Sequence, residues 1–321
     1  MPSAHPVLAP VAAAFYRAQS TFSDPGDLAP LYAGLPADPA QLARTARDLM
    51  IHRGEGELFR HTHPVERLRL DAESRYVDDI LRIVVERDGS PLSRRRAVAD
   101  RFVGVCRDFA LLYCSLLRHS GVPARVRCGF ADYFEDDGFH GDHVVTEYWD
   151  AERGWLIADA QLADPDVTAS CHVDFDPMDV PRDRFLVAGR AWRDIRAGDV
   201  DPAAFGHHRP EDGPLNGEWF VAGSVRLDLA ALNKVETLLW DVWGPEADGQ
   251  SEEGDGDTLT EPFRELMDRV SLVVAPDFPR DVPFEAARRI FTEDDRLRTP
   301  RTVLSLSEYG PHLPVTLRPF D

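Results

Sequence analysis

The stretch from residue 106 to residue 159 constrains the fold most, because its hydrophobic pattern changes there from the period of a helix to that of strands. After Cys106, apolar residues recur at steps of three and four, which predicts an amphipathic helix; they are Phe109, Leu112, Tyr113, Leu116 and Leu117. Gly121 and Pro123 follow, as is typical beyond a helix end. The sequence therefore predicts a helix that begins at Cys106.

Three strand-like segments come after this helix, at 124–130, 143–149 and 155–159. A five-residue turn that ends in glycine joins the second to the third, which predicts an antiparallel hairpin. The expected fold class is α+β, with the Cys106 helix packed on an antiparallel sheet that carries a histidine and an aspartate. Helical extensions are expected on both sides of this core.

Cys106 is a candidate nucleophile because of its place at the start of the predicted helix. A helix N-terminus offers free backbone N–H groups and the positive end of the helix dipole, and both favour an anion. This setting lowers the pKa of a thiol, and the thiolate is the reactive form. The same N–H groups could stabilise the oxyanion of a tetrahedral intermediate.

The hairpin supplies the other two parts of a catalytic triad. His143 opens its first strand, Asp159 ends its second, and counting from the turn places His143 opposite residues at about 159 to 161. His143 would take the thiol proton, and Asp159 would orient the imidazole. Three further acids stand near in sequence and stay open as alternatives to Asp159, namely Asp142, Glu147 and Asp164.

These segments resemble the transglutaminase-like superfamily of papain-like fold. The resemblance rests on Gly104-Val105-Cys106-Arg107-Asp108-Phe109-Ala110, on Gly121-Val122-Pro123-Ala124-Arg125, on His143 and Trp149, and on Gly154-Trp155 followed by Asp159. It covers residues from about 90 to 165 and implies Cys106 as nucleophile, His143 as base and Asp159 as orienting acid. The superfamily includes protein crosslinkers, peptidases, deglycosylating amidases and amide-forming enzymes, so the resemblance leaves the reaction open.

The expected function is cysteine-dependent acyl transfer through a thioester acyl-enzyme. Its partners would be an acyl donor (an amide, peptide or thioester) and an acceptor, either an amine or water. Two alternatives stand beside it: a cysteine peptidase or amidase proper, and a non-catalytic binding module with an inherited fold. No upstream glutamine stands at a convincing position to complete an oxyanion hole.

Four residues near the triad are candidates for substrate contact: Arg107, Asp142, Trp149 and Trp155. The loop before His143 also gathers acids and aromatic residues, namely Asp132, Glu135, Asp136, Asp137 and Asp142 with Tyr133, Phe134 and Phe139. If this loop borders the site, its charge would favour a cationic or amine-bearing ligand. A solvated loop is the plain alternative.

Neither a cofactor nor a metal is expected. A metal site built from His140, His143, Cys171 and His172 is conceivable, but no spacing matches a zinc motif. Cys114 and Cys128 lie in the predicted helix and strand, where packing is the expected role.

Composition excludes some partners and environments. The chain has 321 residues, a formal charge of −20 and 43% hydrophobic residues, so nucleic acid and anionic membranes would repel it. It contains no run of apolar residues long enough to span a membrane and begins without the basic region of a signal peptide. Four cysteines do not make a disulfide framework in a chain of this length, so the cytoplasm is the expected location.

The expected organisation is linear. Residues 1–89 form a helical segment, residues 90–181 the catalytic core, and residues 182–321 a mixed helical extension. Asp38-Pro39 predicts one helix start, with Asp38 as N-cap, and Ser90-Pro91 predicts another, short helix. The segment 244–260 is rich in Gly, Asp and Glu, which is typical of a solvated loop.

Overall fold

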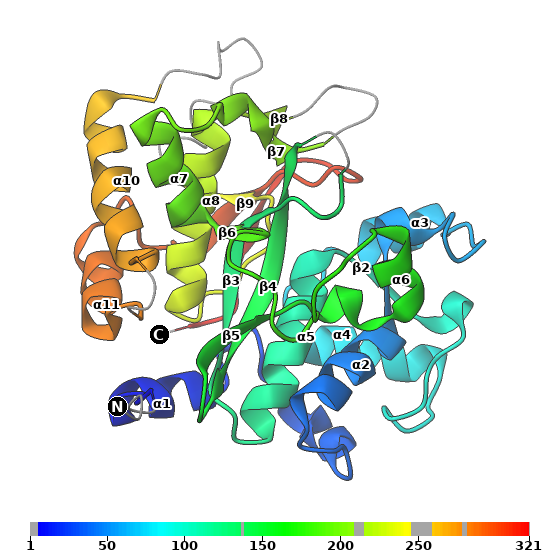
Figure 1. Ribbon diagram of the computed structural model, residues 1–321. Coiled ribbons are helices and arrows are strands. Elements are labelled where there is room, and N and C mark those ends of the chain that lie inside the picture. Colours follow the sequence, from blue (N-terminus) through cyan, green and yellow to red (C-terminus); the bar gives the residue numbers. More distant parts are fainter. Residues whose placement is uncertain (1–5, 136–137, 209–214, 245–258, 278–280, 321) are drawn as a thin grey trace. The chain divides into compact units, whose positions relative to one another are not determined.

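The computed structural model describes residues 6–135, 138–208, 215–244, 259–277 and 281–320 (Figure 1). Helices and sheets are both present, so the predicted α+β class is confirmed. Most of the solvated loop expected at 244–260 lies outside the described residues, as do Asp136 and Asp137. Within the described chain, no helix combines the length and the apolar character needed to cross a bilayer.

The chain divides into two compact units that alternate along the sequence. The first comprises the residues up to Val126, Val145–Val180 and Phe320; the second comprises Arg127–Val144 and Pro181–Pro319. The linear division into 1–89, 90–181 and 182–321 stays a prediction.

Helices dominate the first unit. Its elements are α1 (Pro10–Arg17), η1 (Gly26–Tyr32), α2 (Pro39–Leu49), β1 (Met50–His52), η2 (Arg53–Glu55), α3 (Val65–Leu70), α4 (Val77–Arg87), η3 (Val98–Asp100), β2 (Phe102–Gly104), α5 (Cys106–His119), β5 (Gly154–Ala158), η4 (Ala160–Ala163) and α6 (Pro165–Ser170). As predicted, Asp38 caps α2, accepting a hydrogen bond from the backbone N–H of Gln41 over 2.9 Å. Helix α5 begins at Cys106, and every one of its residues but His119 is buried.

One local prediction for this unit was wrong, and one strand was missed. No helix begins at Ser90-Pro91, because the buried guanidinium of Arg96 donates hydrogen bonds to the backbone oxygens of Ser90, Pro91 and Arg94, which a helix would use internally. The short strand β1 was not predicted. It pairs in parallel with β2, whose residues lie fifty positions later.

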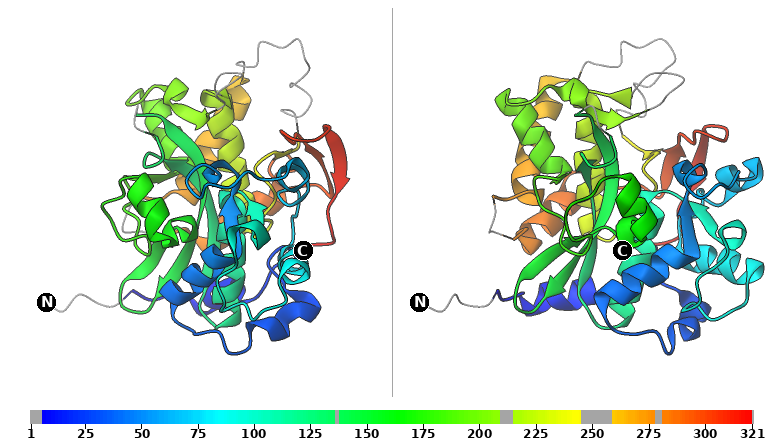
Figure 2. Two further views of the ribbon diagram at one scale, coloured as in Figure 1. Left: turned by 90° about the vertical axis from the view of Figure 1, so that its right-hand side faces the viewer. Right: turned by 45° about the vertical axis from the view of Figure 1, so that its right-hand side comes forward.

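The second unit contains the rest of the elements. They are β6 (Phe185–Val187), α7 (Ala188–Ala197), η5 (Pro202–Ala204), β7 (Phe205–His207), β8 (Leu215–Asn216), α8 (Glu218–Leu232), β9 (Asp241–Val242), α10 (Glu261–Val274), α11 (Phe284–Glu293), β10 (Thr302–Ser305) and β11 (Leu313–Thr316). Helices α7, α8 and α10 pack side by side (Figures 1 and 2). A Cβ at Gly189 would lie 2.6 Å from Cγ2 of Val274, so only glycine permits this approach of α7 to α10.

The strands β3 (Ala124–Ala131) and β4 (His140–Asp150) each have residues in both units. The sheet order is β6-β3-β4-β7-β8, with β5 also paired to β4. Strands β4 and β5 form the predicted antiparallel hairpin, from Thr146↔Ala158 to Asp150↔Gly154. The sheet also holds a parallel pair, β4 with β7, so it is mixed where a purely antiparallel sheet was expected.

Candidate active site

Cys106 is the first residue of α5, as the sequence predicted, and its side chain is 5% exposed. The preceding residue, Val105, donates its N–H to Oδ2 of Asp108 over 2.9 Å, and Asp108 donates its own N–H back to the Val105 carbonyl. Among the described residues, none accepts a hydrogen bond from the backbone N–H of Cys106. The helix start therefore offers one donor beside the thiol, as an oxyanion would require.

Asp108 is the buried acid that fixes this helix start. Burial raises the pKa of its carboxyl to about 6, while the neighbouring Arg107 and the Val105 N–H act in the opposite direction. Arg107 lies 3.1 Å from Oδ1 of Asp108. The carboxyl thus connects the guanidinium to the backbone directly ahead of the candidate nucleophile.

Arg107, a candidate for substrate contact, is itself buried. Its guanidinium donates hydrogen bonds to the backbone oxygens of Ser74 and Arg75, over 3.2 and 2.6 Å. These contacts attach the start of α5 to the turn before α4. They give Arg107 a structural role, and we assign it no contact with substrate.

The parallel pairing of β1 with β2 places the turn η2, which follows β1, beside the segment that leads to Cys106. His52 lies opposite Gly104, two residues ahead of Cys106. Parallel strands end at a common edge, so the turn η2 begins beside the segment that leads into α5. Glu55 ends this turn, and its side chain is buried.

Asp159 lies one residue beyond the last hairpin pair, Thr146↔Ala158, which places it next in register to Val145. Its side chain is 2% exposed, and its Oδ1 accepts a hydrogen bond from the N–H of Gln161 over 2.9 Å. Val145 and His143 are two residues apart on β4, so they share one face of that strand. The placement of His143 opposite residues 159 to 161 stays a prediction.

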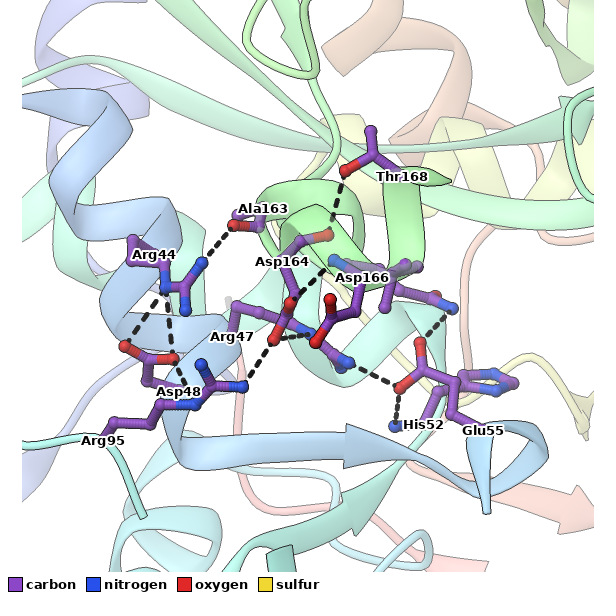
Figure 3. Close-up of polar contacts among 12 residues, drawn as sticks. Arg44, Arg47, Asp48, His52, Glu55, Arg95, Ala163, Asp164, Asp166 and Thr168 are labelled. Atoms are coloured by element: carbon purple, nitrogen blue, oxygen red, sulfur yellow. Dashed lines mark hydrogen bonds and ion pairs between the residues drawn. The ribbon is translucent and has the colours of Figure 1, made fainter. Parts of the chain in front are cut away.

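A buried hydrogen-bond network connects the turn after Asp159 to η2. Gln161 donates from Nε2 to Oε1 of Glu55 over 3.2 Å. The other oxygen of Glu55 lies 2.8 Å from Nη2 of Arg47 and accepts the N–H of His52 over 3.0 Å (Figure 3). Burial raises the pKa of Glu55, and Arg47 is the main opposing influence.

The far end of η4 is fixed by two arginines. Arg44 donates to the carbonyl of Ala163 over 3.0 Å, and Arg95 donates to Oδ2 of Asp164 over 2.9 Å (Figure 3). Asp164 also caps α6 by accepting the N–H of Asp166. Contacts at both ends therefore hold the short turn that carries Asp159.

The three acids left open as alternatives to Asp159 all have other partners. Asp164 caps α6, Glu147 lies 2.7 Å from Nε of Arg125, and Asp142 lies 2.9 Å from Nδ1 of His207. Asp142 also neighbours His143 on a strand, where adjacent side chains point to opposite faces. Asp159 as the orienting acid stays a prediction.

His143 belongs to the second unit, whereas Cys106 and Asp159 belong to the first. Its side chain is 3% exposed and packs among aromatic rings. The imidazole centroid lies 4.9 Å from that of Phe134, 5.9 Å from Tyr133 and 6.2 Å from Phe185, all in edge-to-face arrangements. These three contacts give His143 an aromatic environment.

Two acids of the loop before His143 are paired with cationic or titratable side chains. Asp132 pairs with Arg184 over 2.7 Å, and Asp142 pairs with His207. Paired carboxylates attract a cationic ligand less than solitary ones do, because the arginine or a protonated histidine offsets their charge. Tyr133 and Phe134 are the residues of this loop whose rings pack against His143.

Trp149 and Trp155 pair with each other at the turn end of the hairpin, with ring centroids 5.5 Å apart. The Arg125 guanidinium lies 3.9 Å from the Trp155 ring centre, which gives that ring a structural cation–π contact. Trp149 is six residues from His143 along β4, or roughly 20 Å at the usual rise of a strand. A role of the two tryptophans in substrate contact stays a prediction.

No cluster of three or more potential metal ligands occurs among the residues described. Cys114 and Cys128 are buried, and Cys171 is partly exposed. Sequence reasoning missed Arg47, Glu55 and Gln161. The contact of Gln161 with Glu55 joins positions 106 residues apart, and no local motif signals such a pair.

Comparison with known proteins finds a family match over part of the chain. Residues 70–160, which include Cys106, His143 and Asp159, match the family described as the transglutaminase-like superfamily. A candidate cysteine protease of known structure, from Cytophaga hutchinsonii, is 21% identical, with 44% of each chain covered and a TM-score of 0.17. This chain thus spans less than half the length of that protein, and so low a TM-score supports no argument about function. No curated protein matches the sequence significantly.

Proposed function

We propose that this protein, which belongs to the transglutaminase-like superfamily through residues 70–160, is an enzyme that transfers acyl groups through a cysteine thioester. The observation that carries the proposal is the start of α5, where Cys106 stands beside its own backbone N–H, from which no described residue accepts a hydrogen bond. A nucleophile and an oxyanion donor are the two groups that acyl transfer needs first.

In the proposed reaction His143 takes the proton of the Cys106 thiol, and the thiolate attacks an amide, ester or thioester carbonyl. The backbone N–H of Cys106 stabilises the tetrahedral oxyanion. As the intermediate collapses, His143 returns the proton to the leaving group, and a thioester remains on Cys106. Asp159 orients the imidazole and stabilises its charged form.

An amine or water then attacks the thioester carbonyl and gives up a proton to His143, and the Cys106 thiolate leaves. An amine acceptor gives amide formation, and water gives the hydrolysis of a peptidase or amidase. Both outcomes share the acyl-enzyme, so its detection tests the proposal before the acceptor is known.

The test uses p-nitrophenyl acetate as an activated acyl donor. We expect intact-mass and peptide analysis to find one acetyl group on Cys106 and none on Cys114 or Cys128. The adduct should be absent in Cys106→Ala and should form far more slowly in His143→Ala. An unmodified Cys106 after prolonged exposure would overturn the proposal and favour a binding module with an inherited fold.

A further inference from the structure

We infer that the acceptor side of this site selects an apolar amine, and that Phe134 is the residue that contacts it. The inference rests on the proposed function, because it concerns the second half of acyl transfer. It begins from the aromatic surroundings of His143 in the second unit.

The acceptor's position follows from its chemistry. When an amine attacks the thioester, its nitrogen gives a proton to His143 as the new C–N bond forms and the C–S bond breaks. Proton transfer needs the amine nitrogen at about 3 Å from an imidazole nitrogen. The carbon substituent of the amine must then lie against the groups that surround the imidazole.

Of the three rings in contact with His143, one is accessible. Tyr133 and Phe185 are buried, with 3% and 1% of their surface exposed, whereas Phe134 is half-buried. Phe134 also has the shortest ring separation from His143, 4.9 Å. It is therefore the ring that can present a free face to a ligand close to the base.

The pairing of two carboxylates on the same loop also favours an apolar ligand. The carboxylates of Asp132 and Asp142 are paired with Arg184 and His207. Pairing weakens the attraction of these two carboxylates for a cationic amine, and the apolar contact offered by Phe134 is the feature on which we base ligand selection. An apolar amine gains free energy by covering the Phe134 ring, whereas water gains none, so the ring favours transfer over hydrolysis.

The chain offers a matched control in Phe139. It belongs to the same loop and is half-buried like Phe134. Its ring packs edge-to-face on His208, with centroids 5.9 Å apart. Phe139→Ala therefore also removes an aromatic ring from this loop, but the ring that it removes packs on His208 and not on His143.

The experiment measures how the acetyl group on Cys106 divides between amine and water. Protein acylated with p-nitrophenyl acetate is mixed with benzylamine, and N-benzylacetamide and acetate are quantified. In Phe134→Ala we expect the ratio of amide to acetate to fall by about tenfold, as loss of a partly buried ring contact implies. Phe139→Ala should keep the ratio of the unmodified protein. Phe134→Leu should give a ratio between those of Phe134→Ala and the unmodified protein.

Three results would overturn the inference. They are an unchanged ratio in Phe134→Ala, an equal fall in Phe134→Ala and Phe139→Ala, and better partitioning to the dication putrescine than to benzylamine. Formation of acetyl-Cys106 is measured separately in each variant. Failure of the inference thus leaves a normal acyl-enzyme, whereas failure of the proposed function leaves none.

Discussion

The side-chain amide of Gln161 donates a 3.2 Å hydrogen bond to Oε1 of Glu55, which lies 106 positions earlier in the chain. The backbone N–H of the same glutamine donates to the carboxylate of Asp159. Gln161 thus connects the candidate acid to η2, and η2 follows the strand that pairs with the approach to Cys106. We expect this connection to position the acid.

Gln161→Met removes the side-chain bond and leaves Glu55 paired with Arg47. We expect the maximal rate of Cys106 acylation to fall by roughly tenfold, because a small displacement of a catalytic group is costly. The apparent KM for the donor should stay unchanged, since no substrate contact is lost.

The control for this substitution is Gln19→Met. It removes two side-chain bonds, the 2.9 Å bond donated to the carbonyl of Ser115 near the other end of α5 and the 2.6 Å bond accepted from the hydroxyl of Ser23. Gln19→Met should therefore lose at least as much thermal stability as Gln161→Met, yet only Gln161→Met should lose acylation rate. Equal rates in both would show that Gln161 has a structural role alone.

Asp108 should make stability depend on pH. Burial raises the pKa of its carboxyl from 3.8 to about 6, so the folded state binds its proton more tightly than the unfolded state does. Its contribution to stability is therefore fully present below about pH 4 and is lost as the pH rises through about 6. The shift corresponds to about 3 kcal/mol.

Asp108→Asn cannot titrate, so the comparison isolates this contribution. We expect the free energy of unfolding of the unmodified protein, minus that of Asp108→Asn, to decrease between pH 4 and pH 6. Urea denaturation at several pH values measures it. A difference that stays constant over this range would contradict the assignment.

A threonine joins helix α5 to strand β4 inside the first unit. The buried hydroxyl of Thr146 donates to the carbonyl of Ala110 over 2.8 Å. Thr146→Val should lower the free energy of unfolding by about 1 kcal/mol or somewhat more, because the acceptor stays buried. Thr168→Val, which removes a local bond to the carbonyl of Asp164, should cost less. Equal losses in urea denaturation would count against this role.

Two ion pairs of different burial should differ in their effect on stability. Arg125 and Glu147 are both buried, whereas Arg184 and Asp132 are each about one-third exposed. Glu147→Ala should cost about 3–5 kcal/mol, since it leaves a buried guanidinium without its carboxylate. Asp132→Ala should cost less than about 1 kcal/mol. Thermal and urea denaturation of both variants provide the comparison.

The parts of the site that depend on local pattern could be predicted. The period of the apolar residues and the glycine at 121 defined α5, which begins at Cys106 and ends at His119. Likewise, the glycine at 154 and the alternating strands defined the hairpin. Local signals succeed here because helix starts and tight turns are set by a few neighbouring residues.

The parts that depend on long-range contact could not be predicted. Strand β1 directly follows the amphipathic helix α2 in sequence, and its pairing with β2 makes it a strand. Phe134 and Phe139 look equivalent in the loop, yet one ring packs on His143 and the other on His208. The conformation of the folded loop decides which ring contacts which histidine, and the spacing of these residues in the sequence does not indicate it.

The most direct test of the central claim is the pH dependence of iodoacetamide alkylation at each cysteine, read by peptide mass spectrometry. Exposure alone predicts that Cys171 reacts first, because it is partly exposed while Cys106 is buried. The proposed Cys106–His143 pair predicts the reverse order, with Cys106 alkylated fastest well below the usual thiol pKa of about 8.5. This advantage should disappear in His143→Ala. If Cys171 reacts first and His143→Ala leaves the rate at Cys106 unchanged, the catalytic account is contradicted.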